Sequence, residues 1–95
     1  MIGIIAKLRV KEGQGPAFAD HMGGMTHKVE TNESGNLFYR GYRTGDPNLF
    51  VALEVYQDQA AVEAHRTSDH VAAAMGNVGP MLDGDLEVDT LEQVW

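Results

Sequence analysis

Cysteine is absent from this chain of 95 residues, and positive charge is scarce, with seven Lys and Arg against 14 Asp and Glu. Without cysteine the chain has no disulfide, no thiol nucleophile and no thiolate metal site, which favours a cytoplasmic protein. The net charge of −7 disfavours nucleic acid and anionic membrane surfaces as partners, because both repel an acidic protein. No apolar run approaches the ~20 residues that cross a bilayer. We expect one domain over residues 1–95, with no nucleic-acid or membrane partner.

Apolar residues that alternate with polar ones predict four strands. The first covers the start of the chain, from Ile2 to Val10, and the next two lie at about 37–43 and 49–56. The turn residues Thr44 to Asn48 join the second and third strands, so these two form an antiparallel hairpin. The fourth strand begins near Leu86 and ends near Trp95.

Two segments show helical spacing instead. Pro16 suits a helix start, and the residues that follow place four apolar side chains on one face: Phe18, Met22, Met25 and Val29. Gly23 and Gly24 weaken this helix and are expected to bend it or to admit another backbone. A second helix begins after Asp58 as N-cap, bends near Thr67-Ser68 and reaches Met75, and residues 76–84 are expected to form a loop.

The predicted order is β-α-β-β-α-β, whose simplest closure is an α+β, ferredoxin-like fold with an antiparallel sheet and both helices on one face. One face of the third strand is aliphatic and suits packing against the helices; it carries Leu49, Val51, Leu53 and Val55. The opposite face would then carry Phe50, Ala52 and Tyr56 in solvent. We therefore predict a homodimer in which two such sheets pack face to face.

Glu54-Val55-Tyr56 lies at the end of the third predicted strand, and the helix that follows carries His65, Ser68 and His70 in an H-x-x-S-x-H pattern. With these motifs, the stretch from Leu49 to His70 resembles the antibiotic biosynthesis monooxygenase domain family. The resemblance implies a dimeric α/β barrel of ferredoxin-like subunits, and members include quinol and polyketide monooxygenases that need no metal or flavin. Haem-degrading relatives carry an asparagine in the first strand, which this chain lacks. The position after Gly35 is Asn36, where the family often has cysteine.

His65 is the first candidate for a catalytic residue. A neutral imidazole near pH 7 can take a proton from a phenol or quinol, and the electron-rich anion can pass an electron to O₂. The alternative is that His65 hydrogen-bonds a buried backbone group and holds a bent helix. Glu54 is the second candidate, because a carboxylate can orient His65 or tune its pKa. It can equally anchor the following turn or pair with an arginine across the dimer.

A further group of residues is predicted to bind an aromatic substrate. Tyr39 and Tyr56, with Tyr42, can line a pocket, or else pack at the interface between two sheets. Asn32 and Arg40 can bind a substrate carbonyl or anion, or else cap a helix and form an ion pair. Ser68 is expected at the same cavity, but a Ser68-His65-Asp69 triad is rejected because nothing supplies an oxyanion hole.

No metal site is predicted, because His65 and His70 are five residues apart rather than the four that place two ligands on one helix face. No cofactor is expected. These residues favour a cofactor-independent monooxygenase acting on a quinol or polycyclic phenol. The alternatives are a non-catalytic small-molecule-binding or stress-response protein and, third, a haem-binding protein with His65 or His70 as axial ligand.

Overall fold

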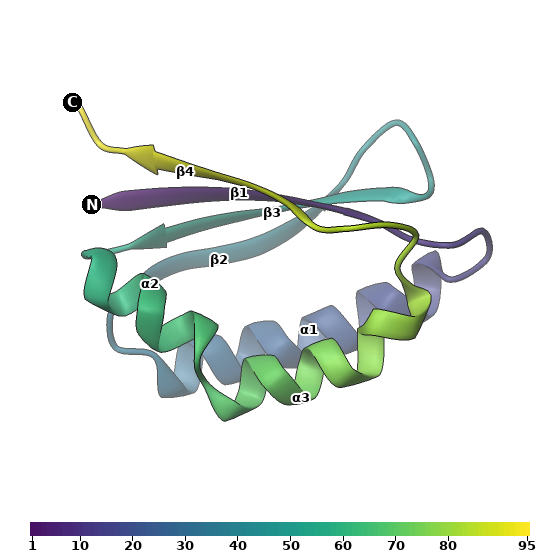
Figure 1. The fold of residues 1–95 in the computed structure, drawn as a ribbon, viewed down its shortest axis with the longest axis horizontal. Coiled ribbons are helices and arrows are strands. Elements are labelled where there is room, and N and C mark those ends of the chain that lie inside the picture. The colour runs from purple at the N-terminus through teal and green to yellow at the C-terminus, as the bar shows by residue number, and fades with distance from the viewer.

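The computed structural model describes residues 1–95 and contains the predicted order of elements, with the second helix divided in two. The strands form one antiparallel sheet in the order β2-β3-β1-β4, and the helices cover one face of it (Figure 1). This is the ferredoxin-like α+β fold that the sequence predicts. The elements are β1 (Ile2–Arg9), α1 (Gly15–Asn32), β2 (Asn36–Arg43), β3 (Leu49–Tyr56), α2 (Gln59–Arg66), α3 (Asp69–Val78), the 3₁₀ turn η1 (Gly79–Met81) and β4 (Glu87–Glu92).

Helix α1 packs through the face that its periodicity predicts. Phe18, Met25 and Val29 are buried, and Met22 packs against them at the rim. The helix begins with proline in its first turn, as expected. It runs unbroken through the glycine pair at 23 and 24, so the predicted bend at this point is wrong.

The second helical segment breaks where the sequence predicts. The Asp58 carboxylate accepts the backbone N–H of Ala61 at 2.9 Å and begins α2, and the Ser68 hydroxyl accepts the N–H of Val71 and begins α3. The expected loop over residues 76–84 is only partly correct, because α3 continues to Val78 and η1 follows. Val78 is fully buried against β1 and α1, and this packing outweighs the weak helix propensity of Gly76.

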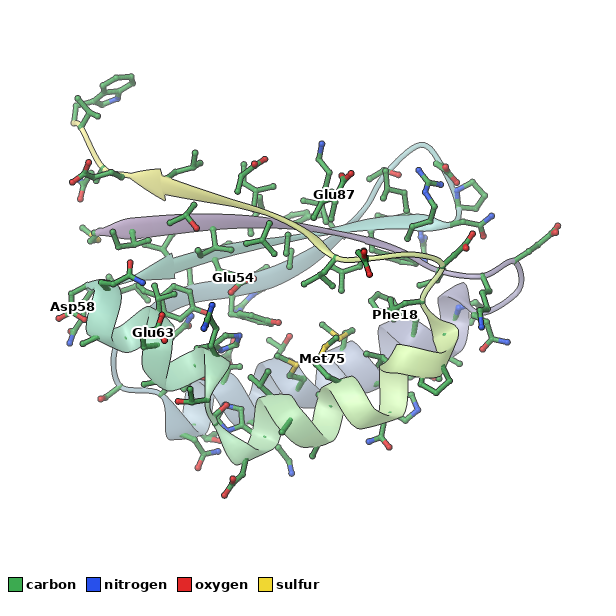
Figure 2. The ribbon with its side chains drawn as sticks, in the orientation of Figure 1. Phe18, Glu54, Asp58, Glu63, Met75 and Glu87 are labelled. Atoms are coloured by element: carbon green, nitrogen blue, oxygen red, sulfur yellow. The ribbon has the colours of Figure 1, made fainter.

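The predicted assignment of the two faces of β3 is reversed in the structure. Ala52, Glu54 and Tyr56 are buried beneath the helices, whereas Leu49, Val51, Leu53 and Val55 lie half-buried on the open face. Strand pairing explains the reversal, because Ile4, Ala6 and Leu8 of β1 stand opposite Glu54, Ala52 and Phe50 and share their face. Figure 2 shows Glu54 in the space between sheet and helices, and Glu87 on the other side of the sheet.

The open face of the sheet carries an apolar area even with this reversal, beside the charged side chains of Lys7, Arg40 and Glu87. Phe38, Tyr42 and Leu91 are between 39% and 48% exposed, and register places them beside Val55, Val51 and Gly3. A covering partner would therefore bury these side chains in place of Phe50, Ala52 and Tyr56. No helix of this chain is long and apolar enough to span a bilayer.

Candidate active site

The break between α2 and α3 places two histidines beside one carboxylate. His65 lies in the last turn of α2 and His70 in the first turn of α3, so Thr67 and Ser68 turn the chain between them. The Ser68 hydroxyl donates to the carbonyl of His65 at 2.7 Å while it caps α3. Both rings consequently face Glu33, which follows the end of α1.

Glu33 holds both imidazoles through short hydrogen bonds. The Nδ1 of His65 lies 2.9 Å from Oε2 and 3.1 Å from Oε1 of Glu33, and the Nε2 of His70 lies 2.5 Å from Oε2. A carboxylate only accepts, so Nδ1 of His65 carries the hydrogen and donates it. In the neutral ring this leaves Nε2 of His65 with its lone pair exposed on the other side.

The free edge of His65 faces a second, separate carboxylate. Its Nε2 lies 3.9 Å from Oε1 of Glu54, and the Tyr56 hydroxyl donates to that same oxygen at 2.6 Å. The rings of Tyr39 and Tyr56 lie on either side, with centroids 5.6 and 5.5 Å from that of His65. The Tyr39 hydroxyl makes only a weak contact with the sulfur of Met25 at 3.9 Å, so it is available to a ligand.

These groups line a cavity of about 370 Å³ between the sheet and the helices. This volume suits a small aromatic molecule. Figure 2 shows Met75 of α3 pointing into the same space. Most of the lining is apolar, and its other members include Ile4, Met22, Val62, Val71, Leu86 and Val88.

Burial sets the protonation of the acidic groups in the cavity. It raises the pKa of the Glu54 carboxyl above its ordinary value, and this outweighs the opposing hydrogen bond from Tyr56 and the charge of His65. Burial is also the main cause of a raised pKa for the hydroxyls of Tyr39 and Tyr56, to which nearby carboxylates add. Both tyrosines therefore remain protonated at neutral pH.

Only part of the predicted set of site residues meets at this cavity. The structure brings together His65, Glu54, Tyr39 and Tyr56. Asn32 instead donates to the carbonyl of Lys28 at the exposed end of α1. Arg40 starts from the open face of the edge strand β2, away from the cavity, and its guanidinium pairs with Glu30 of α1.

Ser68 also serves the backbone rather than the cavity, through the two hydrogen bonds at the helix break. Glu33 and His70 were not among the residues predicted for the site. His70 stood in the H-x-x-S-x-H pattern, and the predicted bend at Thr67-Ser68 was the signal that brings two histidines five residues apart onto one partner.

Glu33, His65 and His70 are also the residues that could hold a metal ion, because one ligand atom from each lies within 4.8 Å of the others. The five-residue spacing of His65 and His70 excludes a shared ligand face only on one continuous helix, and the chain breaks between α2 and α3. Each imidazole nitrogen in the cluster already has the Glu33 carboxylate as its partner.

Comparison with known protein families gives a match to the model for "antibiotic biosynthesis monooxygenase" over residues 1–77. The chain belongs to this family. The match includes β1 to α3 and every residue of the cavity except those contributed by the C-terminal strand. A comparison with curated protein sequences finds no significant match.

Solved structures share the fold of this family member. A Caulobacter crescentus CB15 protein that carries the family's name superposes with a TM-score of 0.94 at 28% identity, covering 99% of this chain and 90% of that one. A protein of the same designation from Nitrosomonas europaea gives 0.90 at 22% identity over 100% of both chains. Rv0793 from Mycobacterium tuberculosis gives 0.89 at 24% identity, over 98% and 94%.

The raised pKa of Glu54 predicts how stability changes with pH. The folded protein keeps this proton to higher pH than the unfolded chain does, so the free energy of unfolding falls as pH rises from about 4.3 through the folded pKa. Glu54→Gln removes this titration and still accepts the Tyr56 hydroxyl. We expect the variant to lose less stability than the wild type between pH 4 and pH 7 in urea titrations.

Glu63→Gln is the matched control, because Glu63 is an exposed carboxylate on α2. It should keep the pH dependence of the wild type. Equal slopes for Glu54→Gln and the wild type would show that the Glu54 carboxyl is not destabilised by burial.

Proposed function

We propose that this protein is a cofactor-independent monooxygenase that oxidises a quinol or polycyclic phenol with O₂. The observation that carries the proposal is the position of His65 between two carboxylates, with Nδ1 bound to Glu33 and Nε2 open to an apolar cavity. Membership of the antibiotic biosynthesis monooxygenase family supports the same chemistry.

His65 is the proposed general base. Its Nε2 takes the hydroxyl proton of a bound quinol, and the Nδ1–H donated to Glu33 stabilises the imidazolium that forms. The resulting anion gives one electron to O₂, and the two radicals combine into a peroxide on the ring carbon. Loss of water from the peroxide leaves a new carbonyl, so one oxygen atom enters the product and the other leaves as water. The substrate supplies both electrons and both hydrogens.

The cavity walls support this reaction in two ways. Tyr39 keeps its proton and has no strong hydrogen-bond partner, so its hydroxyl can donate to the substrate oxygen. The apolar lining excludes water from the carbanion-like intermediate and the peroxide. Glu54 is the proposed second catalytic group, because it is the only carboxylate on the cavity side of His65 and can receive or return a proton there.

One observation favours a non-catalytic binding protein as the second candidate. Every buried polar side-chain atom has a hydrogen-bond partner, so the Glu33–His65 and Glu54–Tyr56 pairs also serve the fold alone. Such a protein would show a rise in Tm with an aromatic ligand but no turnover.

The proposed functional unit is a homodimer formed through the open face of the sheet. A stable interface buries roughly 1,200–2,000 Å² in total, and in the proposed dimer the open face of the four-stranded sheet supplies this area. The half-exposed aromatic rings of Phe38 and Tyr42 are the side chains that gain most from such burial.

The function is tested by oxygen uptake with a naphthoquinol, corrected for autoxidation. We expect His65→Gln to lower kcat by about 10²–10⁴-fold, since it removes the base, while His21→Gln on exposed α1 leaves kcat unchanged. Glu33→Gln should lower kcat more than it raises KM, because it frees the orientation of His65.

Wild-type rates should also survive treatment with EDTA, since the proposed chemistry uses no metal. Loss of activity on chelation would contradict the cofactor-independent mechanism. No uptake above autoxidation across a panel of quinols, together with ligand-induced stabilisation, would support the binding protein instead.

The dimer is tested by sedimentation velocity at micromolar concentration. Leu53→Lys places a charge at the centre of the open face, beside Ile5 and Arg40, and is expected to give a monomer. Ala72→Lys introduces the same charge on the exposed side of α3 and should remain dimeric. A monomeric wild-type protein would contradict this part of the proposal.

A further inference from the structure

A second hollow, of about 240 Å³, adjoins the cavity that contains His65. It lies between α1 and the edge of the sheet formed by β2 and β3. The two hollows share four wall residues, which are Leu8, Met22, Tyr39 and Ala52. The two hollows are therefore neighbours across these four side chains, and a ligand that occupied both would pass Met22 and Tyr39.

Two glycines leave the second hollow open. Gly23 of α1 and Gly41 of β2 both line it, and a β-carbon added at either would meet no atom within 4 Å. A glycine inside a helix costs about 1 kcal/mol relative to alanine, and α1 does not bend at Gly23. Gly23 therefore contributes neither to helix stability nor to a turn. Because it has no side chain, it leaves space in the second hollow.

The far end of the second hollow carries an unpaired cation. The chain has four arginines, and three of them, at 9, 40 and 66, each lie within 4 Å of a carboxylate. Arg43, at the end of β2, forms no such pair in spite of a net charge of −7. The apolar walls nearby are the rings of Phe18 and Phe50, whose centroids are 5.1 Å apart. An apolar slot that ends at a free guanidinium suits an apolar chain or ring with a carboxylate at its end.

We propose that the second hollow binds the far end of an elongated ligand and that Arg43 binds a carboxylate there. The aromatic end of the same ligand lies beside His65, and this part rests on the proposed function. Met22 and Tyr39 form the shared wall that the ligand passes, and the flexible Met22 side chain can adjust to its width. Arg43 then selects the charge of the substrate, and the space left by Gly23 and Gly41 sets its length.

The charge preference is tested with two fluorescent probes of equal shape, 1-pyrenebutyrate and 1-pyrenebutanol. We expect the wild-type protein to bind the carboxylate about tenfold more tightly than the alcohol, measured by calorimetry at low salt. Arg43→Gln should abolish this preference, whereas Lys7→Gln on the open face of the sheet should retain it. Equal affinity for both probes, or no binding of either, would overturn the inference.

The space is tested with a matched pair of glycine substitutions. Gly23→Leu fills the hollow, and Gly24→Leu makes the same change at the next, exposed position of α1, so both gain equally in helix propensity. We expect Gly23→Leu to weaken binding of both probes at least tenfold and Gly24→Leu to leave it unchanged. Equal effects of the two substitutions would overturn the role of the hollow.

Oxygen uptake with a naphthoquinol that lacks a side chain separates this inference from the proposed function. The control variants Lys7→Gln and Gly24→Leu should turn over this short substrate at the wild-type rate, because neither residue lines either hollow. If the wild type shows no uptake but keeps the tenfold preference for the carboxylate, the proposed function fails while the ligand site stands.

Discussion

The hydrogen bonds between Glu33 and two histidines hold the site and the helical layer together. They join the end of α1 to the break between α2 and α3, and no other side-chain hydrogen bond links α1 to either of these helices. The segment after α1 can lie this close to α2 because residue 35 is glycine. A β-carbon at residue 35 would lie 2.5 Å from the β-carbon of Ala61 in α2. The Gln57 N–H donates to the carbonyl of Gly35 at 2.9 Å and fixes the entry to β2 beside the start of α2.

The same interaction decides whether His65 can act as a base. The side chains of Glu33 and His65 are only 7% and 11% exposed, and removing one partner of a buried charged hydrogen bond costs about 1.5–3 kcal/mol or more. This bond is therefore structural. It also fixes the hydrogen on Nδ1, which turns the lone pair of Nε2 toward the cavity. The structural alternative expected a buried backbone group as the partner of His65, whereas the partner is the Glu33 side chain. With this partner the structural and catalytic roles are compatible, because one hydrogen bond holds the helices and sets the tautomer.

The sequence predicted the order of elements, the buried face of α1, the Asp58 cap of α2 and the break at Thr67-Ser68, because each depends on neighbouring residues. The sequence-based prediction failed where the pairing of strands decides which face is buried. The aliphatic face of β3 was expected beneath the helices, but the register with β1 buries Glu54 and Tyr56, which hydrogen-bond to each other there. Glu33 was missed as a site residue because it is 32 residues from His65, and no local pattern reports a contact across β2, β3 and most of α2.

The tautomer of His65 tests the account most directly. Long-range ¹H–¹⁵N correlation spectra of histidine-labelled protein at pH 8 distinguish a protonated Nδ1 from a protonated Nε2. We expect His65 to carry its hydrogen on Nδ1, and Glu33→Gln to give a mixture of both forms. A wild-type His65 with its hydrogen on Nε2 would have no lone pair toward the cavity, and would contradict its assignment as the base.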